Sequence, residues 1–345
     1  MPYTLLAMEN PLLDIQCKPS QELMDRYDLK ANDAILANAS HEPLYKEIVD
    51  KYEVAYVAGG AAQNTARGAQ YFLPPNSTAY MGCISDDEFG KTMKAAAEAD
   101  GLHTNYEITK KADTGTCAVL ITDNNRSLVA NLAAAEKFQA SFLQKPENWK
   151  LVEDAKYYYM GSFFITHDGG FESARLVSQH ASDNNKTFAL NLSAPFLSQF
   201  YKERLDSIIK NTDILFGNED EARTYSEQAG WDTKDVEEIA KKLSQLEKGN
   251  ANPRLVVITQ GSEATVVAGG DASNTYPVIK VAESDIVDTN GAGDGFCGGF
   301  MGLYAQGIND PARCVQAGHY LANIVIKRVG PTYPPMAERT NIPTF

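Results

Sequence analysis

The sequence predicts an α/β fold, in which helices on both faces of a mostly parallel sheet form three layers, together with a small β-rich lid. Apolar strand-like runs alternate with helical patterns over most of the 345 residues. Such alternation is typical of right-handed β-α-β units. Two stretches interrupt the alternation and predict the lid. A glycine-rich turn near the C-terminus is the third informative feature.

The N-terminal run, Met1 to Glu9, predicts the first strand; it is short and lacks the basic segment of a signal peptide. Further strands are predicted at Thr78–Cys83, Ala155–Met160, Thr187–Asn191, Ile214–Gly217 and Leu255–Thr259. Helices are predicted at Gln63–Leu73, Phe89–Asp100, Phe171–Ser182, Gln199–Lys210 and Val236–Leu246.

Residues 15–59 and 103–132 break this rhythm. In the second stretch, 116–122 and 127–132 flank the polar turn 123–125 and predict a hairpin. We interpret both stretches as a lid; the alternative is that they form edge strands of the main sheet. The predicted large domain comprises 1–14, 60–103 and 133–345, and the predicted discontinuous lid comprises 15–59 and 104–132.

Composition excludes several classes of function. The net charge is −14 and the pI is near 4.9, so the chain lacks the basic surface of a nucleic-acid-binding protein. No window reaches the roughly 18 apolar residues of a membrane span. The scattered cysteines show no metal or disulfide spacing; they are Cys17, Cys83, Cys117, Cys297 and Cys314. We expect a monomer in the cytoplasm, and also in the nucleus, with no nucleic-acid or membrane partner.

The turn Asp288-Thr289-Asn290-Gly291-Ala292-Gly293-Asp294 joins an apolar run to a helical pattern. Its small residues leave the backbone N–H groups accessible, so they can form an anion-binding nest at a helix N-terminus. Asp294 then lies in the first helical turn. This arrangement suits phosphoryl transfer to a hydroxyl, because the nest holds negative charge while the carboxylate accepts the proton. The alternative is an ordinary helix start capped by Asp294.

A second glycine site follows the apolar run Val54–Val57 and opens another helix. Gly59 and Gly60 permit close approach of a ligand to the backbone. Asn64 would face the same opening one turn later and can both donate and accept hydrogen bonds. The alternative is a strand end with Asn64 on the helix surface.

The two glycine sites occur in order with five further segments: Asn10-Pro11-Leu12-Leu13-Asp14, Asn125-Arg126-Ser127-Leu128, Asn191-Leu192-Ser193-Ala194-Pro195-Phe196, Gly217-Asn218-Glu219-Asp220-Glu221 and Gly318-His319-Tyr320. Over almost the whole chain this set resembles the ribokinase-like (PfkB) family of carbohydrate and nucleoside kinases. The segments at 10–14 and 191–196 resemble its adenosine-phosphorylating branch. The resemblance implies a ribokinase-like three-layer αβα domain with a lid.

The resemblance assigns catalytic roles. Asp294 would take the proton from the ribose 5′-hydroxyl, and the backbone N–H groups of Gly291, Ala292 and Gly293 would stabilise the transferred phosphoryl group. Arg126, on the predicted hairpin, would reach the phosphates when the lid closes; the alternative is a solvated surface arginine. A permanently charged, bidentate guanidinium suits that role.

For the nucleoside, the resemblance implies that Asp14 binds the ribose 2′- and 3′-hydroxyls, although an aspartate after a strand can simply form a turn. Gly60 and Asn64 would contact the ribose and Asn10 would lie near the base. Other expected substrate contacts are Gly59 and Asn290, with pocket walls from Leu12, Leu128, Ala130, Phe164 and Phe196. Each wall residue could equally belong to the core.

For ATP, the resemblance implies contacts from Asn218, Thr259, Gly261, His319 and Asn323. Glu221, with Asn218, would organise Mg²⁺ through water, since Mg²⁺ keeps several waters. The same Asn-x-x-Glu spacing is also typical of a helix capping box, and both interpretations can hold together.

Three residues depart from the family pattern: Ala61 stands where a hydroxyl can occur, Ala34 replaces an amide that can line the adenine pocket, and Gly295 replaces a common alanine. None removes a catalytic group. We therefore predict an ATP- and Mg²⁺-dependent enzyme that phosphorylates the adenosine 5′-hydroxyl, giving AMP and ADP. The alternatives are an inosine-guanosine or sugar acceptor, or a catalytically silent nucleoside-binding protein. A nicotinamide-dependent dehydrogenase fits less well, because no Gly-x-Gly-x-x-Gly follows the first strand.

Overall fold

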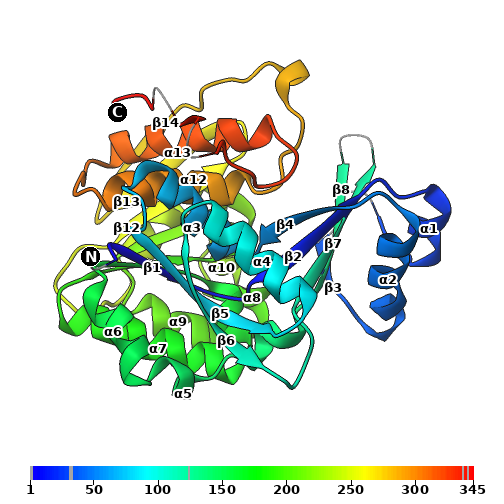
Figure 1. Ribbon diagram of the computed structural model, residues 1–345. Helices are drawn as coiled ribbons and strands as arrows, with labels where there is room; N and C mark the ends of the chain where they lie inside the picture. The colour runs from blue at the N-terminus through cyan, green and yellow to red at the C-terminus, as the bar shows by residue number, and fades with distance from the viewer. Residues whose placement is uncertain (1–2, 31–33, 123–124, 336–337, 340–341) are drawn as a thin grey trace.

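The computed structural model describes residues 3–30, 34–122, 125–335, 338–339 and 342–345. Within these residues the strands form a nine-stranded sheet and a five-stranded sheet. Figure 1 shows the larger sheet among helices and the smaller sheet projecting from one side. No helix of the described residues is long and apolar enough to cross a membrane.

The larger sheet has the strand order β14-β13-β12-β11-β10-β9-β1-β5-β6. Its strands are β1 (Leu5–Met8), β5 (Thr78–Ser85), β6 (His103–Thr109), β9 (Tyr157–Gly161), β10 (Thr187–Asn191), β11 (Ile214–Asn218), β12 (Leu255–Gln260), β13 (Glu263–Gly269) and β14 (Ala272–Tyr276). Pairing is parallel from β6 to β12 and antiparallel for the last two strands. The predicted mostly parallel α/β sheet is confirmed.

Helices cover both faces of this sheet (Figure 1). One face carries α3 (Ala61–Phe72), α4 (Glu88–Ala99), α12 (Ala292–Tyr304) and α13 (Pro311–Ile326). The other carries α5 (Ala140–Leu143), α6 (Pro146–Asp154), α7 (Asp168–Asp183), α8 (Pro195–Phe200), α9 (Lys202–Ile209), α10 (Glu219–Gln228) and α11 (Val236–Ser244). The helices predicted from sequence occur within a few residues of their expected bounds, except that Gln199–Lys210 is interrupted at Tyr201 between α8 and α9.

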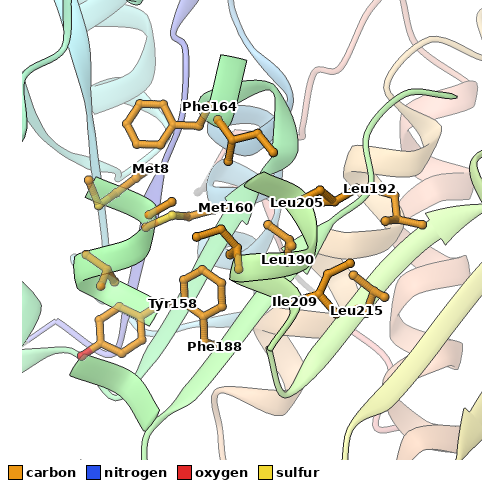
Figure 2. Close-up of a cluster of buried hydrophobic side chains, with 14 of the residues drawn as sticks. Met8, Tyr158, Met160, Phe164, Phe188, Leu190, Leu192, Leu205, Ile209 and Leu215 are labelled. Atoms are coloured by element: carbon orange, nitrogen blue, oxygen red, sulfur yellow. The ribbon is translucent and has the colours of Figure 1, made fainter. Parts of the chain in front are cut away.

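The two-residue period of the strands supplies both hydrophobic layers. In β1, Leu5 and Ala7 pack toward α3 and α12, whereas Leu6 and Met8 pack toward the opposite helices. Figure 2 shows the second layer, where side chains of the central strands meet those of α9. The sheet is therefore buried on both faces, as expected for parallel strands.

The smaller sheet, with its two helices, is called the lid below. Its strand order is β3-β8-β7-β2-β4. The elements are β2 (Leu12–Cys17), α1 (Gln21–Arg26), β3 (Ala34–Leu36), α2 (Glu42–Lys51), β4 (Ala55–Gly59), β7 (Thr116–Thr122) and β8 (Asn125–Asn131). The predicted hairpin is confirmed, since β7 and β8 pair antiparallel from Thr116↔Asn131 to Thr122↔Asn125. Positions 123 and 124 of the predicted turn lie outside the described residues.

Two predicted domain boundaries are corrected. Residues 104–109, assigned to the lid, belong to β6, which pairs with β5 from Ala79↔His103 to Ser85↔Thr109 and forms an edge of the large sheet. Residues 12–14, assigned to the large domain, begin β2 of the lid sheet. In both places only a short irregular segment, residues 9–11 or 110–115, separates a strand of one sheet from a strand of the other, and composition alone does not mark that boundary.

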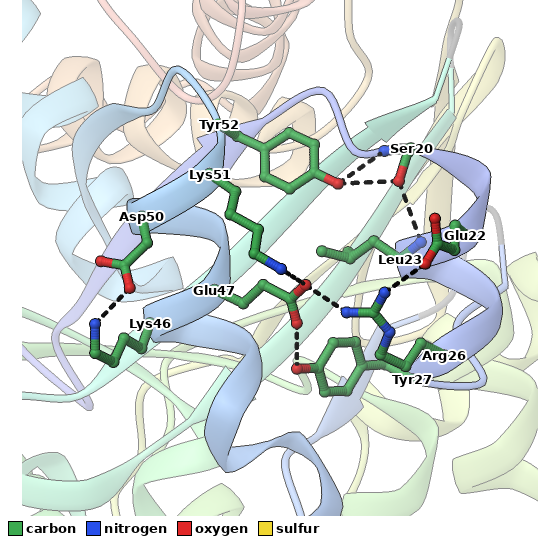
Figure 3. Close-up of polar contacts among 10 residues, drawn as sticks. All are labelled: Ser20, Glu22, Leu23, Arg26, Tyr27, Lys46, Glu47, Asp50, Lys51 and Tyr52. Carbon is green, nitrogen blue, oxygen red and sulfur yellow. Dashed lines mark hydrogen bonds and ion pairs between the residues drawn. The ribbon is translucent and has the colours of Figure 1, made fainter.

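An exposed charge network joins the two lid helices (Figure 3). Glu47 on α2 accepts hydrogen bonds from Lys51, from Tyr27 and from Arg26 on α1. These bonds, with the Lys51 contact first, lower the pKa of Glu47 to about 2. The network adds a polar link between α1 and α2, whose buried side chains pack together on the lid sheet.

Glycines let α12 lie unusually close to its neighbours. A Cβ added at Gly298 would lie 2.8 Å from the Cα of Gly68 on α3, and one at Gly302 would lie 2.9 Å from the Ala69 carbonyl oxygen. On the other side, a Cβ at Gly318 of α13 would meet the Phe296 ring at 2.7 Å. The helix is therefore held between α3 and α13 with no room for larger residues at these positions.

We predict that Gly298→Ala destabilises the protein. The added methyl meets backbone atoms of α3, which cannot move away cheaply, so overpacking outweighs the better helix propensity of alanine. Urea unfolding should show a loss of about 1–3 kcal/mol. Gly269→Ala is the control, because a Cβ there has its nearest neighbour at 3.9 Å. Equal stability of the two variants would contradict the close helix contact.

Candidate active site

Asp294 lies in the first turn of α12, directly after the predicted anion-binding turn. Gly291 precedes the helix with a φ of 75°, in the left-handed region that favours glycine. The Asp288 carboxylate holds the turn, because it accepts hydrogen bonds from the backbone N–H groups of Asn290 at 3.0 Å and Gly330 at 2.8 Å. The turn therefore presents the positive end of a helix beside a carboxylate.

The Asp294 side chain is joined to α3. Asn64 Nδ2 donates to Asp294 Oδ2 over 2.9 Å, and the Thr65 hydroxyl donates to the Asp294 carbonyl oxygen over 3.4 Å. Burial raises the pKa of Asp294 to about 7, while the Asn64 hydrogen bond and the charge of Arg67 oppose that rise. A carboxylate with this pKa is suited to accept a proton near neutral pH.

Two adjoining cavities meet here. The smaller, of about 120 Å³, is lined by both Asp294 and Glu221. The larger, of about 610 Å³, is within the roughly 300–1,000 Å³ typical of small-molecule sites. Both are lined by Thr259 and Gly293, so the second cavity continues from the first across the start of α12.

The larger cavity brings together four residues expected to bind ATP: Thr259, Gly261, His319 and Asn323. It also includes Ala292 and Gly293 of the glycine turn. His319 lies 2.8 Å from the Thr265 hydroxyl, and burial lowers its pKa to about 4. The histidine packs against the Phe296 ring at a centroid distance of 5.4 Å and, being neutral, adds no charge to the cavity wall.

Asn218 and Glu221 lie at the start of α10 and form the anticipated capping box. The Asn218 side chain accepts from the Glu221 backbone N–H, and the Glu221 carboxylate accepts from the Asn218 backbone and side-chain N–H groups at 2.9 Å each. Burial raises the pKa of Glu221 to about 7. Both residues also line the smaller cavity, so the cap and a place at the site occur together.

The second glycine site lies against the segment at 10–14. Leu12 pairs with Gly59 across the antiparallel strands β2 and β4. A Cβ at Gly59 would collide with the Asp14 carboxylate, and one at Gly60, whose φ is 92°, would lie 2.5 Å from the Asn10 carbonyl oxygen. A side chain at position 59 would displace the Asp14 carboxylate, and one at position 60 would meet backbone in a left-handed conformation, so the two sequence-predicted segments form one closely packed corner between lid and large domain.

Asn10 is buried and oriented by two neighbours. Its Nδ2 donates to the Phe163 carbonyl oxygen over 3.4 Å, and its Oδ1 lies 3.2 Å from His167 Nε2. The Gly170 backbone N–H donates to His167 Nδ1, so the ring proton lies on Nε2 and donates to Asn10. Asn10 is thus fixed before any ligand binds.

One predicted pocket wall is corrected. Phe164 is fully buried in the core, where its ring packs against Phe138 at a centroid distance of 5.3 Å. Its neighbour Phe163 is only partly buried and faces the ring of Phe196 at 5.8 Å. The short 3-10 segment after β9 turns Phe163 outward and Phe164 inward. The sequence alone does not show which of two adjacent phenylalanines is buried.

The remaining wall residues, Leu12, Leu128 and Ala130, are partly buried on the lid sheet. Arg126 pairs through its backbone with Ile121 in the hairpin, but its side chain lies outside the described residues, as does that of Ala34. Asn290, on the glycine turn, is also partly buried.

Comparison with known proteins identifies the family. The model of the pfkB family of carbohydrate kinases matches residues 22–338. The chain belongs to this family. It is 47% identical over 334 residues to adenosine kinase 1 of Arabidopsis thaliana, covering 96% of each chain. It is also similar to two solved structures: Anopheles gambiae adenosine kinase in complex with P1,P4-di(adenosine-5) tetraphosphate (38% identity, TM-score 0.90) and Schistosoma mansoni adenosine kinase in complex with adenosine (33%, 0.91), each covering 99% of both chains.

One departure from the family pattern, Gly295, has a local explanation. A Cβ at Gly295 would lie 2.9 Å from Val325 on α13, so glycine relieves crowding between the two helices. Ala61 lines the smaller cavity next to Asp294.

Two buried charged residues beside the candidate site, Glu9 and Arg67, were not predicted from the sequence. Glu9 is buried at the end of β1 and accepts a hydrogen bond from the Ala62 backbone N–H at 2.8 Å, at the start of α3. Burial, together with the nearby charge of Asp294, raises the pKa of Glu9 to about 8, and the hydrogen bond from Ala62 opposes that rise. Arg67 lies one turn after Asn64 and is 4% exposed. Both are charged residues within otherwise apolar segments, and this pattern could have indicated a buried charge near a site.

We predict that Asp294 titrates near pH 7 in the free protein, because burial disfavours its charge. Asn64→Leu should move the pKa of Asp294 upward, since it removes a hydrogen bond that favours the ionised form. Carboxyl ¹³C NMR measures both values, and Asp294→Asn identifies the signal by removing it.

The matched control is Asn105→Leu, which breaks a side-chain hydrogen bond of 2.8 Å to Asn148 away from the site. It should leave the Asp294 titration unchanged. A value near 4 in the unaltered protein would contradict the burial argument.

Proposed function

We propose that this protein transfers the γ-phosphoryl group of ATP to the 5′-hydroxyl of adenosine, giving AMP and ADP. The observation that carries the proposal is the position of Asp294. Its carboxylate lies at the positive end of α12, where a cavity large enough for a nucleotide adjoins a smaller one. A base beside an anion-binding helix start is what in-line phosphoryl transfer to a hydroxyl requires.

In this mechanism the Asp294 carboxylate accepts the proton as the 5′-oxygen forms its bond to the γ-phosphorus. The bond between the γ-phosphorus and the β,γ-bridging oxygen breaks, and ADP leaves with that oxygen. We propose that the backbone N–H groups of Gly291, Ala292 and Gly293, at the start of α12, stabilise the transferring group; the Ala292 N–H, which donates to the Thr289 carbonyl oxygen over 3.2 Å, would share that bond. Asn64 keeps the carboxylate pointed toward the smaller cavity.

The acceptor assignment rests on the corner formed by 10–14 and 59–60. Asp14, 7% exposed beside Gly59, is suited to hold two vicinal hydroxyls, and the fixed Asn10 lies near the expected base. Phe163 and Phe196 supply aromatic surface, with Leu12, Leu128 and Ala130 on the lid side. The similarity to proteins named adenosine kinase at 47% identity favours adenosine over inosine, guanosine or a sugar. We further propose that lid closure brings Arg126 to the phosphates.

Mg²⁺ fits the site through water and not through a protein cage. Among the described residues no three acidic, histidine or cysteine side chains are grouped to hold a metal. Both Glu221 oxygens already accept hydrogen bonds from Asn218, yet the residue lines the small cavity. Mg²⁺ keeps most of its own waters, which Glu221 and Asn218 could orient. When bound with ATP, the ion would offset phosphate charge.

Asp294→Asn should abolish most of the phosphoryl transfer, because the amide cannot accept the hydroxyl proton. We expect kcat to fall by ~10²–10⁴-fold while adenosine binding is retained. AMP formation by chromatography and adenosine binding by calorimetry measure the two effects. The exposed Asp271→Asn is the control. Transfer by Asp294→Asn at near the unaltered rate would overturn the mechanism, and a panel of acceptors at fixed ATP would test the choice of adenosine.

Glu221→Gln should raise the Mg²⁺ concentration required for half-maximal rate by roughly tenfold or more, as for other outer-shell residues. Glutamine can still accept the hydrogen bond from the Asn218 backbone N–H through its amide oxygen, which keeps the helix start capped. Its NH₂ group cannot accept from Asn218 Nδ2, so that bond is lost together with the charge. Asp220→Asn, an exposed change in the same helical turn, serves as the control. An unchanged Mg²⁺ dependence would show that Glu221 is only a cap.

A further inference from the structure

Arg67 connects three parts of the molecule behind the catalytic base. Its Nε donates to Asp100 Oδ2 over 2.6 Å. One terminal nitrogen donates to three oxygens: the Ala58 carbonyl at 2.6 Å, Asn64 Oδ1 at 3.2 Å and the Pro331 carbonyl at 3.2 Å. With only 4% of its surface exposed, this guanidinium is part of the interior and not of the solvated surface.

These contacts fix which way the Asn64 amide points. A guanidinium has donors and no acceptor, so the Asn64 atom that faces Arg67 must be Oδ1. The amide nitrogen then necessarily faces the Asp294 carboxylate, at 2.9 Å. The reversed amide would place two oxygens against each other at the base and leave Arg67 facing an NH₂ group.

We infer that Arg67 is a positioning residue for phosphoryl transfer, which acts on the base Asp294 through the orientation of Asn64. This inference rests on the proposed function. The line of contacts runs from Asp100 through Arg67 and Asn64 to Asp294, and each link is a hydrogen bond between two side chains.

The same residue holds the surroundings of the base. Ala58 lies near the end of β4, which includes Gly59 and is followed by Gly60. Pro331 packs directly against the Gly291 position of the anion-binding turn. The Tyr333 hydroxyl donates to the Asn64 carbonyl oxygen over 2.9 Å, which fixes the backbone of that residue as well. The acceptor corner, the base and the glycine turn are thus tied to one side chain.

Other ionisable groups face the Asn64–Asp294 pair from each neighbouring element: Glu9 from β1, Tyr159 from β9, Glu221 from α10, Cys297 from α12, Tyr333 from the C-terminal segment and Asp100 beyond Arg67. In contrast to these groups, Arg67 carries a positive charge that favours the ionised form of Asp294.

A double-mutant cycle separates positioning through Asn64 from a general structural role. Arg67→Met should lower kcat about tenfold or more with little change in KM for ATP. In an Asn64→Ala background the same change should lower kcat by a clearly smaller factor, because the route through Asn64 is already gone and only the Arg67 charge and its bonds to Ala58 and Pro331 are lost. Arg67→Lys, which keeps a charged donor, should recover part of the rate.

Equal fold-losses in both backgrounds would overturn the inference, since a structural role would be felt with or without Asn64. So would an unchanged kcat in Arg67→Met. Thermal unfolding of each variant verifies that folding is preserved, and Arg67→Lys repeats the cycle if the methionine variant does not fold.

A measurement independent of activity distinguishes this inference from the proposed function. The ¹⁵N-labelled side-chain amide of Asn64 should shift as Asp294 titrates in the unaltered protein and lose that response in Arg67→Met. If the protein failed to phosphorylate adenosine, the proposed function would be rejected. The amide signal would still show whether Arg67 orients Asn64. A response that persists in Arg67→Met would overturn the inference.

Discussion

The close contact between α3 and α12 is the constraint on which the site depends. Gly68 and Gly298 allow the two backbones to approach to the point where any side chain would collide. At that separation the short amide of Asn64 on α3 reaches the Asp294 carboxylate at the start of α12. Helices at an ordinary distance of about 8–10 Å with larger interface residues would leave this pair apart. The geometry of the base is therefore a consequence of helix packing.

That packing encloses the Asp294 carboxylate, which makes its ionisation less favourable and, in the proposed mechanism, suits it to accept a proton. Enclosing Asp294 raises its pKa to about 7, and Glu9 and Glu221 are similarly raised by burial. For an acid whose pKa rises on folding, ionisation opposes the folded state, so Asp294 lowers stability as pH increases from about 4 to about 7. Asn64 and Arg67 limit this loss by favouring the ionised form. A residue suited to accept a proton is thus also one that destabilises the fold near neutral pH.

The sequence was most informative where a single local pattern decides the structure. Thr187–Asn191 is predicted with its observed bounds, because a short apolar run between helices has few alternatives. The glycine turn and the capping box at Asn218 could also be predicted, because each is determined by a few residues adjacent in the sequence. Arg67 could not be placed this way, since its partners include Pro331, far along the chain. Phe163 and Phe164 differ only through the 3-10 turn that carries them, and β6 looks like a lid strand until its partner β5 is known.

The structure also separates the chemistry from the choice of acceptor. The base and the glycine turn belong to α12 and its neighbours, whereas Asp14 and Gly59 lie on lid strands that pair with each other at the boundary of the large domain. In the proposed mechanism, closure of the lid would carry part of the acceptor site with it. Arg67, bonded to the Ala58 carbonyl near the end of β4, links that boundary to Asp294 through Asn64, so an acceptor held at the corner of β2 and β4 would be connected to the proposed base through this strand end.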